Sequence, residues 1–407
     1  MSQPMTGIRI LEVAEHAFVP TAGAILSDWG AEVIKVEHAE RGDAMRGLGQ
    51  TGVMTLGGSV HVLNEHANRG KRSIGIDLAR SEGREVLYKL AATADVFLTN
   101  KLPTVLERLE IDVEHIRAHN PEIIYVRGTA FGPVGPDMNR GGYDMTAFWC
   151  RAGCAEGSPV PGMGFIVPQP APAYGDSLGG MTIAGGIAGA LLKRERTGEP
   201  SVVDVSLLAT GVWAMGAAVA LGLQTGEPWN PLSGAKGGGP KNPLTGIYKT
   251  SDDRFISVVM LQAFKYWPDF CEHIGRPELA TNERFDTHEK LAENAAVARE
   301  IINEVIAGGT LAEWTERFST LQGQWAPVQN SVEVAADPQV RENGYIAKTA
   351  TADGTAFELA ASPVQFDEQP TGTNRAPTFN EHGDELLREL GLDMDQILEL
   401  KAAGAVT

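Results

Sequence analysis

Cysteine, positive charge and long uncharged stretches are all scarce in this chain of 407 residues. Its three cysteines are too few for a disulfide framework and fit a reducing compartment. A net charge of −18 argues against nucleic acid or an anionic membrane as the main partner. The first residues contain no apolar run of the length that a secretion signal needs, so we expect a cytoplasmic protein.

The spacings that hold metals and dinucleotides are missing too. Cys150 and Cys154 could share a helix face but have no histidine pair nearby, and His61 and His66 are five positions apart rather than four. We therefore expect no metal site. The loop over residues 15–20, which follows the first predicted strand, contains no G-x-G-x-x-G, so the nicotinamide or flavin fingerprint is absent from its usual place.

One uncharged stretch, Val205 to Gly226, is long enough to span a bilayer. It is rich in alanine and glycine, contains Ser206, Thr210 and Gln224, and stands alone. We interpret it as a helix buried against the segment Met181–Leu192 or against a second subunit, and we expect no membrane contact.

The N-terminal third alternates β-rich and helical patterns, which is typical of a parallel sheet with helices on its faces. The expected strands are Ile8–Val13, Val33–Val36, Ser73–Asp77, Asp95–Thr99 and Glu122–Arg127, and the expected helices include Thr21–Trp29 and Ser81–Ala92.

The chain becomes rich in glycine and proline from Pro228 to Pro243, which indicates a change of domain. Gly237 to Gly239 in this stretch are either a passive linker or an active-site lid that needs glycine to move. A hairpin with a strand is expected over Thr250–Met260. The last helix is expected to begin near Asn380.

A single carboxylate, Asp176, stands between a proline-rich loop and an uncharged helix expected over Met181–Leu192. The prolines keep the loop out of the helical conformation, and free backbone N–H groups converge where a helix begins. One interpretation of Asp176 is a helix N-cap. The other is a nucleophile whose attacking oxygen lies beside oxyanion donors.

Cations gather near the N-terminus in spite of the acidic composition. Such a group suits a small polyanion such as a nucleotide, and the alternative is a solvated face with paired charges. The residues are Lys35, Arg41, Arg46, Arg69, Lys71, Arg72, Arg80 and Arg84.

Several short motifs, in their order and spacing, resemble those of class III (CaiB/BaiF-type) CoA-transferases. This is the family of formyl-CoA:oxalate CoA-transferase and, more distantly, of α-methylacyl-CoA racemase. The motifs run nearly from end to end and are Gly7–Glu12, Gly30–Glu37, Gly42-Asp43 with Arg46, Asn68–Ile74, Gly175–Ser177, Leu191–Gly198 and Ala326–Val328.

The resemblance implies an α/β fold with a Rossmann-like large domain, built on a parallel sheet, and a smaller α+β domain. It also implies an interlocked, ring-like homodimer. Together with the glycine-rich boundary, it predicts the first part of the large CoA-binding domain over 1–200 and a linker helix over 201–227. The small domain is predicted over 228–328. A return linker and the C-terminal part of the large domain are predicted over 329–407.

The resemblance further implies an acyl-CoA:carboxylate CoA-transferase that uses Asp176 to form mixed-anhydride and aspartyl-CoA thioester intermediates. Acyl-CoA and a carboxylic acid are then substrates, and no cofactor is bound permanently. The positions that match CoA contacts of the family are His16, Ala17, Phe18, His38, Arg46, Ile76, Asp77, Leu78, Ala79, Asn100, Lys101, Leu102, Arg108, Arg140 and Tyr143.

The chain departs from the family at Tyr143. Racemases carry a histidine base at this point, in a Gly-His-Asp motif, and formyl-CoA transferases carry a glutamate near it. Tyrosine, with a pKa near 10, is a poor base, so racemisation is disfavoured, as are formyl-CoA and oxalate as substrates. An acyl-CoA racemase or epimerase and a non-catalytic CoA-binding homologue remain the two alternatives.

Overall fold

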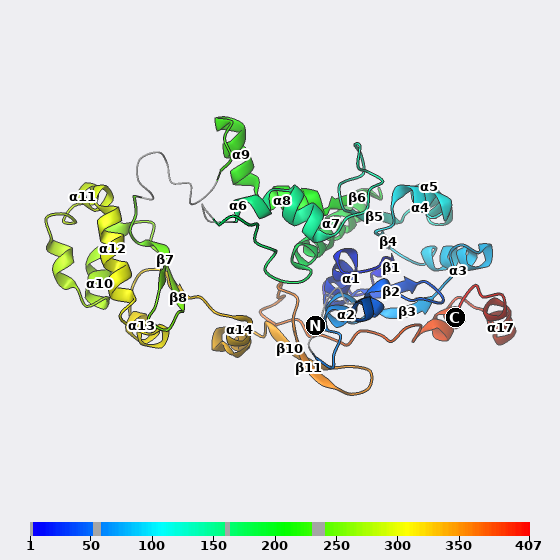
Figure 1. Ribbon diagram of the computed structural model, residues 1–407. Coiled ribbons are helices and arrows are strands. Elements are labelled where there is room, and N and C mark those ends of the chain that lie inside the picture. The colour runs from blue at the N-terminus through cyan, green and yellow to red at the C-terminus, as the bar shows by residue number, and fades with distance from the viewer. Residues whose placement is uncertain (1–2, 52–57, 159–162, 230–240) are drawn as a thin grey trace. The chain divides into compact units, whose positions relative to one another are not determined.

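The computed structural model describes residues 3–51, 58–158, 163–229 and 241–407, so Gly237–Gly239 lie outside the described residues. The chain divides into two compact units (Figure 1). The large unit takes Met1–Pro159, Met163–Glu227 and Pro338–Thr407, and the small unit takes Val160–Gly162 and Pro228–Asp337.

The large unit is built on a six-stranded sheet with the order β3-β2-β1-β4-β5-β6, in which all neighbours are parallel. Its strands are β1 (Arg9–Val13), β2 (Glu32–Glu37), β3 (Arg72–Gly75), β4 (Val96–Thr99), β5 (Ile124–Thr129) and β6 (Val202–Ser206). The prediction of an α/β fold with a parallel sheet is confirmed, although β6 was not predicted. The strand order reverses between β1 and β4, and a crevice at the carboxyl ends of such strands is where this class of sheet binds ligands.

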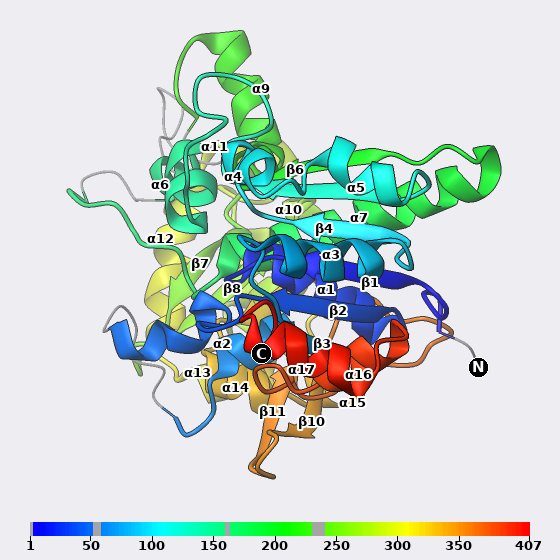
Figure 2. The same ribbon diagram turned by 90° about the vertical axis from the view of Figure 1, so that its right-hand side faces the viewer.

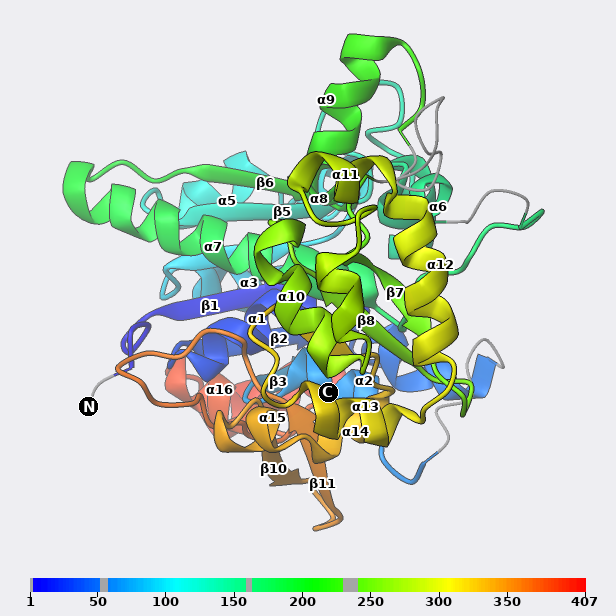
Figure 3. The same cartoon turned by 90° about the vertical axis from the view of Figure 1, so that its left-hand side faces the viewer.

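Helices cover both faces of this sheet, because successive side chains of a strand point to opposite faces. On β1, Ile10 packs into the core that holds α1 (Phe18–Asp28) and α7 (Tyr174–Thr197). Its neighbour Leu11 packs into the core that holds α3 (Ser81–Ala91) and α17 (Met394–Ala402). Figure 2 shows α3, α16 (Gly383–Glu389) and α17 in front of the sheet, and Figure 3 shows α1 and α7 from the other side.

The remaining elements of the large unit include short helices at the strand ends and a two-stranded antiparallel sheet, β10-β11. They are η1 (Ala44–Thr51), α2 (Val62–Asn68), α4 (Pro103–Arg108), α5 (Val113–His119), the π-helix η2 (Met145–Arg151), α6 (Cys154–Gly157), α8 (Leu207–Ala214), α9 (Gly216–Thr225), α15 (Pro338–Glu342), β10 (Ile346–Ala350), β11 (Ala356–Ala360) and α16 (Gly383–Glu389).

The C-terminal end of the chain returns to the edge of the large sheet. Val406 forms a bridge with Ile76, just beyond β3, and the Asp77 amide donates to the carbonyl of Ala405 at 2.9 Å. Both ends of the chain therefore contribute to one unit.

The small unit has an antiparallel sheet, β7-β8-β9, with one face packed against helices around Trp267 and Phe270. Its elements are β7 (Thr245–Lys249), β8 (Phe255–Val259), α10 (Ala263–His273), η3 (Pro277–Thr281), α11 (His288–Glu293), α12 (Ala295–Ile306), α13 (Leu311–Phe318), β9 (Trp325–Pro327) and α14 (Ser331–Ala336). The hairpin expected over Thr250–Met260 is formed by β7 and β8, one strand earlier than predicted.

Two helix predictions were wrong. The expected helix over Val205–Gly226 is instead the end of β6 followed by α8 and α9, which meet at an angle of 71°. No residue of α9 is buried in the described chain. Among the described residues no single helix is long and apolar enough to cross a membrane, although the bent pair α8–α9 meets that criterion by length and composition.

The other correction concerns α7, which begins at Tyr174 rather than near Met181. Its N-cap is Ala173, so the prediction that Asp176 could be the N-cap is wrong: Asp176 lies in the first helical turn. The helix is buried along one face only, through residues such as Ile183 and Ile187, while Leu192 is 51% exposed.

Candidate active site

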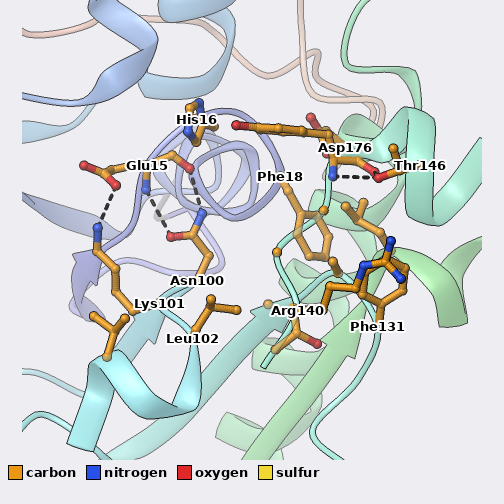
Figure 4. Close-up of a pocket in the computed structure, with 18 residues that line it drawn as sticks. Glu15, His16, Phe18, Asn100, Lys101, Leu102, Phe131, Arg140, Thr146 and Asp176 are labelled. Carbon is orange, nitrogen blue, oxygen red and sulfur yellow. Dashed lines mark hydrogen bonds and ion pairs between the residues drawn. The ribbon is translucent and has the colours of Figure 1, made fainter. Parts of the chain in front are cut away.

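A cavity of about 540 Å³ lies where the strand order of the large sheet reverses. Its walls come from the loops after β1, β4 and β5, from the segment before η2, and from the first turn of α7 (Figure 4). The lining residues are Glu15, His16, Phe18, Asn100, Lys101, Leu102, Val105, Gly128, Thr129, Ala130, Phe131, Arg140, Gly141, Gly142, Tyr143, Thr146, Asp176 and Leu207.

The loops after β1 and β4 are tied together across the reversal point. The side chain of Asn100 accepts from the Glu15 amide at 3.2 Å and donates to the Glu15 carbonyl at 2.7 Å. The ammonium of Lys101 lies 2.6 Å from the Glu15 carboxylate, and Figure 4 shows the two side chains pointing toward each other. This side of the cavity therefore carries a balanced pair of charges.

The opposite side of the cavity is aromatic and cationic. The guanidinium groups of Arg140 and Arg151 lie 5.7 and 4.8 Å from the centre of the Phe131 ring. Arg140 is 67% exposed at its side chain and has only a loose ion pair, at 3.8 Å, with Asp137. The Tyr143 ring is 62% exposed and meets the His16 ring edge-on at 5.6 Å. This rim offers an exposed positive charge to an anionic ligand.

Asp176 is placed by a sharp turn into α7. Ala173 has a φ of 55°, a left-handed conformation that costs a non-glycine residue about 1–3 kcal/mol and is frequent at functional sites. The first amide of this turn to bond within the helix is that of Ser177, which donates to the Ala173 carbonyl at 2.9 Å. Amides that precede it have no helical acceptor. The first turn of α7, which carries Asp176, therefore has amides that the helix itself does not satisfy.

The environment of Asp176 favours the protonated carboxyl group. Burial, with a smaller contribution from the negative charge of Asp144, raises the pKa of Asp176 to about 8. In the described part of the chain no side chain donates a hydrogen bond to this carboxylate. A carboxylate that is not stabilised by solvent or by hydrogen bonds is a stronger nucleophile once it is ionised.

The structure brings part of the predicted set together. Asp176 and seven of the residues that match CoA contacts line the cavity: His16, Phe18, Asn100, Lys101, Leu102, Arg140 and Tyr143. The other eight do not line it and are Ala17, His38, Arg46, Ile76, Asp77, Leu78, Ala79 and Arg108.

Most of these eight residues follow a strand at the carboxyl edge of the sheet, which is the edge that carries the cavity. His38 follows β2, and the segment Ile76–Ala79 follows β3. Arg46 is bound elsewhere: it donates to both oxygens of the Glu37 carboxylate at 2.7 Å and to the Pro377 carbonyl at 3.2 Å. Arg108 is an exposed residue at the end of α4.

The N-terminal cations were predicted to suit a polyanion, and for three of them this is wrong. Lys35 and Lys71 have fully buried ammonium groups that contact Glu12 at 3.2 and 2.8 Å, and Arg69 is buried against Asp28 at 2.7 Å. Buried charges need such partners, so these side chains are engaged in buried ion pairs and do not face a ligand.

Sequence reasoning missed Glu15, Val105, Thr146, Leu207 and the run Gly128–Phe131 as lining residues. A signal for that run was present, because β5 was predicted and the carboxyl ends of parallel strands meet at one edge. Leu207 follows β6, which was not predicted. Among the described residues no group of three or more histidine, cysteine, aspartate or glutamate side chains could hold a metal ion.

Comparison with known proteins points to one family. The model of CoA-transferase family III matches residues 5–383. The (R)-2-hydroxy-4-methylpentanoate CoA-transferase of Clostridioides difficile is 29% identical over 403 residues, which is 99% of each chain. The succinate–glutarate CoA-transferase of Agrobacterium fabrum is 30% identical over 95% of this chain and 96% of its own. A CaiB/BaiF family protein from Brucella suis has a crystal structure with a TM-score of 0.80 and 27% identity, over 96% of this chain and 100% of that one.

Proposed function

Because the chain belongs to CoA-transferase family III and is an acyl-CoA:carboxylate CoA-transferase, we propose that Asp176 carries the acyl and CoA groups covalently during transfer. The observation behind this proposal is its position. Asp176 is a carboxylate on the wall of the cavity at the strand-order reversal, in the first turn of α7, and the partial burial of this residue raises its pKa.

The first half of the reaction loads CoA onto the enzyme. An oxygen of the Asp176 carboxylate attacks the carbonyl carbon of the acyl-CoA thioester, the carbon–sulfur bond breaks, and CoA leaves as a thiolate. The product on the enzyme is a mixed anhydride. The thiolate then attacks the Asp176 carbonyl carbon and expels the first acid as a carboxylate, which leaves an aspartyl-CoA thioester.

The second half repeats these steps in reverse order with the acceptor acid. The acceptor carboxylate attacks the Asp176 carbonyl carbon, expels the CoA thiolate and forms a second mixed anhydride. The thiolate attacks the acyl carbon of the acceptor, and the Asp176 carboxylate is released. No proton is gained or lost over the cycle, and the free energy of the thioester is retained.

The surroundings of Asp176 support each step. Every addition to a carbonyl carbon creates an oxyanion, and the free amides of the first turn of α7 are suited to stabilise it. Arg140 offers exposed positive charge at the cavity for the phosphates of CoA, which is a substrate and not a resident cofactor. The aromatic rings of Phe18 and Phe131 offer an apolar wall to the pantetheine arm or the acyl group.

We further infer a homodimer, which the family likeness implies. The side chains of Trp213 on α8 and Leu223 on α9 are 87% and 83% exposed. Apolar surface of this kind on a helix pair is characteristic of a subunit interface.

The test is a transfer assay that assumes no substrate. The protein is incubated with a mixture of acyl-CoA thioesters and carboxylic acids, and mass spectrometry detects new thioesters. The proposal predicts new acyl-CoA products with wild type and none with Asp176→Asn. Asp204→Asn is the matched control and should retain transfer, because it removes a carboxylate of β6 that pairs with Arg127 of β5. Transfer by the Asp176 variant at the wild-type rate would contradict the proposal.

A further inference from the structure

The wall of the cavity after β1 contains a backbone conformation that needs an external restraint. His16, whose ring lines the cavity, has a φ of 67°. Non-glycine residues adopt this left-handed region seldom, because the Cβ atom crowds the backbone. Something outside residues Ala14–His16 must hold the loop in this form.

Three side chains from other parts of the chain bind the backbone of this loop, and each of them binds a different residue of the loop. The Lys35 ammonium donates to the Ala14 carbonyl at 3.0 Å. Asn100 bonds both the amide and the carbonyl of Glu15. The His16 amide donates to the Asp43 carboxylate at 2.9 Å. The bond to Asp43 is made by the residue in the strained conformation.

The Asp43 carboxylate is buried, and both of its oxygens contact other groups. Asp43 is 1% exposed, and the oxygen that binds the His16 amide also accepts from the Met45 amide at 2.8 Å. Its second oxygen contacts the Lys35 ammonium at 2.7 Å. A buried ion pair with further hydrogen bonds permits one orientation of its members.

The buried network reaches the loop from two sides. Lys35 bonds the Ala14 carbonyl and the Asp43 carboxylate, and Asp43 bonds the His16 amide, so the two side chains bracket the loop. The Asp43 amide in turn donates to the Glu37 carboxylate at 2.8 Å, which ties the segment after β2 to its strand. Strands β1 and β2 are parallel neighbours, so their carboxyl ends, and the segments after them, lie at one edge.

We propose that Asp43 is a positioning residue for CoA binding: it holds the His16 peptide in its left-handed conformation and so fixes the cavity wall formed by Glu15 and His16. This inference rests on the proposed function only for the identity of the ligand. Asp43 touches neither the cavity nor Asp176. Its loss lets the loop relax to an ordinary conformation, which moves the His16 ring and the Glu15–Lys101 pair away from the ligand.

The test compares two buried carboxylates in the large unit by titration calorimetry with CoA. Asp43→Asn replaces the charge that holds Lys35 and the His16 amide. Asp28→Asn is the matched control, because Asp28 is equally buried and paired with Arg69 but does not contact the cavity wall. A merely structural residue changes the fraction of folded protein, and thus the stoichiometry, whereas a positioning residue changes the dissociation constant.

We expect Asp43→Asn to weaken CoA binding by about tenfold or more with unchanged stoichiometry, since the substitution leaves only a neutral oxygen for the His16 amide and turns an NH2 donor toward the Lys35 ammonium. Asp28→Asn should retain the wild-type dissociation constant. An unchanged constant in Asp43→Asn, or an equal rise in both variants, would overturn the inference.

A second pair of variants decides the matter if Asp43→Asn does not fold. His16→Gly and His16→Val both remove the ring, but only valine resists a positive φ. Weaker CoA binding or lower melting temperature in the valine variant supports the left-handed loop, and equal values for both variants overturn it.

Wild type that binds CoA without any transfer would refute only the proposed function, whereas wild type that does not bind CoA would refute both.

Discussion

At the scale of the residue, the site depends on a conflict at Asp176. The attacking carboxylate must be ionised, while burial and Asp144 raise its pKa to about 8. A nucleophile with such a pKa reacts well when ionised but is mostly protonated at neutral pH. The activity of the free enzyme should therefore report the titration of this group.

The pH profile is the first consequence. With acyl-CoA as the varied substrate, kcat/KM should rise with pH, reach half its maximum near pH 8, and level off above it, because only the ionised form attacks. Steady-state rates across a pH series measure this. A profile that is flat from pH 6 to 9 would contradict a raised pKa at the nucleophile.

The Asp144 charge provides an internal check on that profile. Asp144→Asn removes the neighbouring negative charge, which should move the half-maximal pH downward. Asp204→Asn, a carboxylate outside the cavity, serves as the control and should leave the midpoint in place. An identical midpoint in all three proteins would mean that the rise reports another group.

Whereas kcat/KM should rise with pH, the contribution of Asp176 to the stability of the folded protein should fall as pH rises. The folded-state pKa of Asp176 is raised above its unfolded value, so between about pH 4 and 8 the folded protein binds the extra proton. The contribution of this carboxyl group to stability is therefore lost as pH rises through that range. The melting temperature of Asp176→Asn, compared with wild type, should improve from pH 5 to pH 9. A constant difference would argue that the carboxyl pKa is not raised in the fold.

At the scale of the element, the glycines of α7 explain how Asp176 reaches the cavity. A Cβ atom at Gly179 would lie 2.3 Å from the Phe18 ring, and a Cβ atom at Gly180 would lie 2.8 Å from Thr21. Phe18 and Thr21 both belong to α1. The absence of side chains lets the two helices approach closely. Phe18 is wedged between α7 and β5, because a Cβ at Gly128 would also lie 3.1 Å from its ring.

This packing predicts opposite effects for the same substitution at two places in one helix. Gly179→Ala forces Phe18 aside and should cost about 1–3 kcal/mol of stability. Gly189→Ala, where no atom lies within 4 Å of the new methyl group, should stabilise the helix by about 0.5–1 kcal/mol. Thermal melting of both variants is the measurement, and destabilisation by Gly189→Ala or tolerance of Gly179→Ala would contradict the close packing.

Local patterns were enough to predict most strands of the large sheet but not the course of the chain from residue 174 to 226. Runs rich in valine, isoleucine and leucine mark β1 and β2 plainly. The start of α7 was hidden because Gly175, Gly179 and Gly180 are poor helix formers. Tertiary packing against η2 for Gly175, and against α1 for Gly179 and Gly180, holds them in the helix. The strand β6 was missed because Val205 and Ser206 continue into an uncharged helix with no turn residue between them.

At the scale of the molecule, the sequence predicted the family and the place of Asp176 between a loop and a helix, but not which cations line the cavity. From the sequence alone, Lys35 and Lys71 look like residues that could bind phosphate. Only the fold reveals that Glu12 lies between them. The binding of His16 by Asp43 joins residues 27 positions apart, and no local pattern carries that information.

The assembly gives a prediction at this scale. Light scattering should find twice the 43.4 kDa mass of the chain, because a partner subunit is expected to cover the apolar surface of α8 and α9. Leu223→Asp places a charge on that surface and should raise the monomer fraction or lower the melting temperature. A wild-type monomer at micromolar concentration would refute the proposed dimer.

The central claim is that Asp176 becomes covalently linked to CoA, and chemical trapping tests it most directly. The protein is mixed with acyl-CoA thioesters, treated with borohydride and digested, and the peptide that contains residue 176 is sequenced by mass spectrometry. The account predicts that wild type, with acyl-CoA present, yields homoserine in place of Asp176, because borohydride reduces the aspartyl thioester to an alcohol. Turnover of acyl-CoA to new thioesters with residue 176 recovered as unmodified aspartate would contradict it.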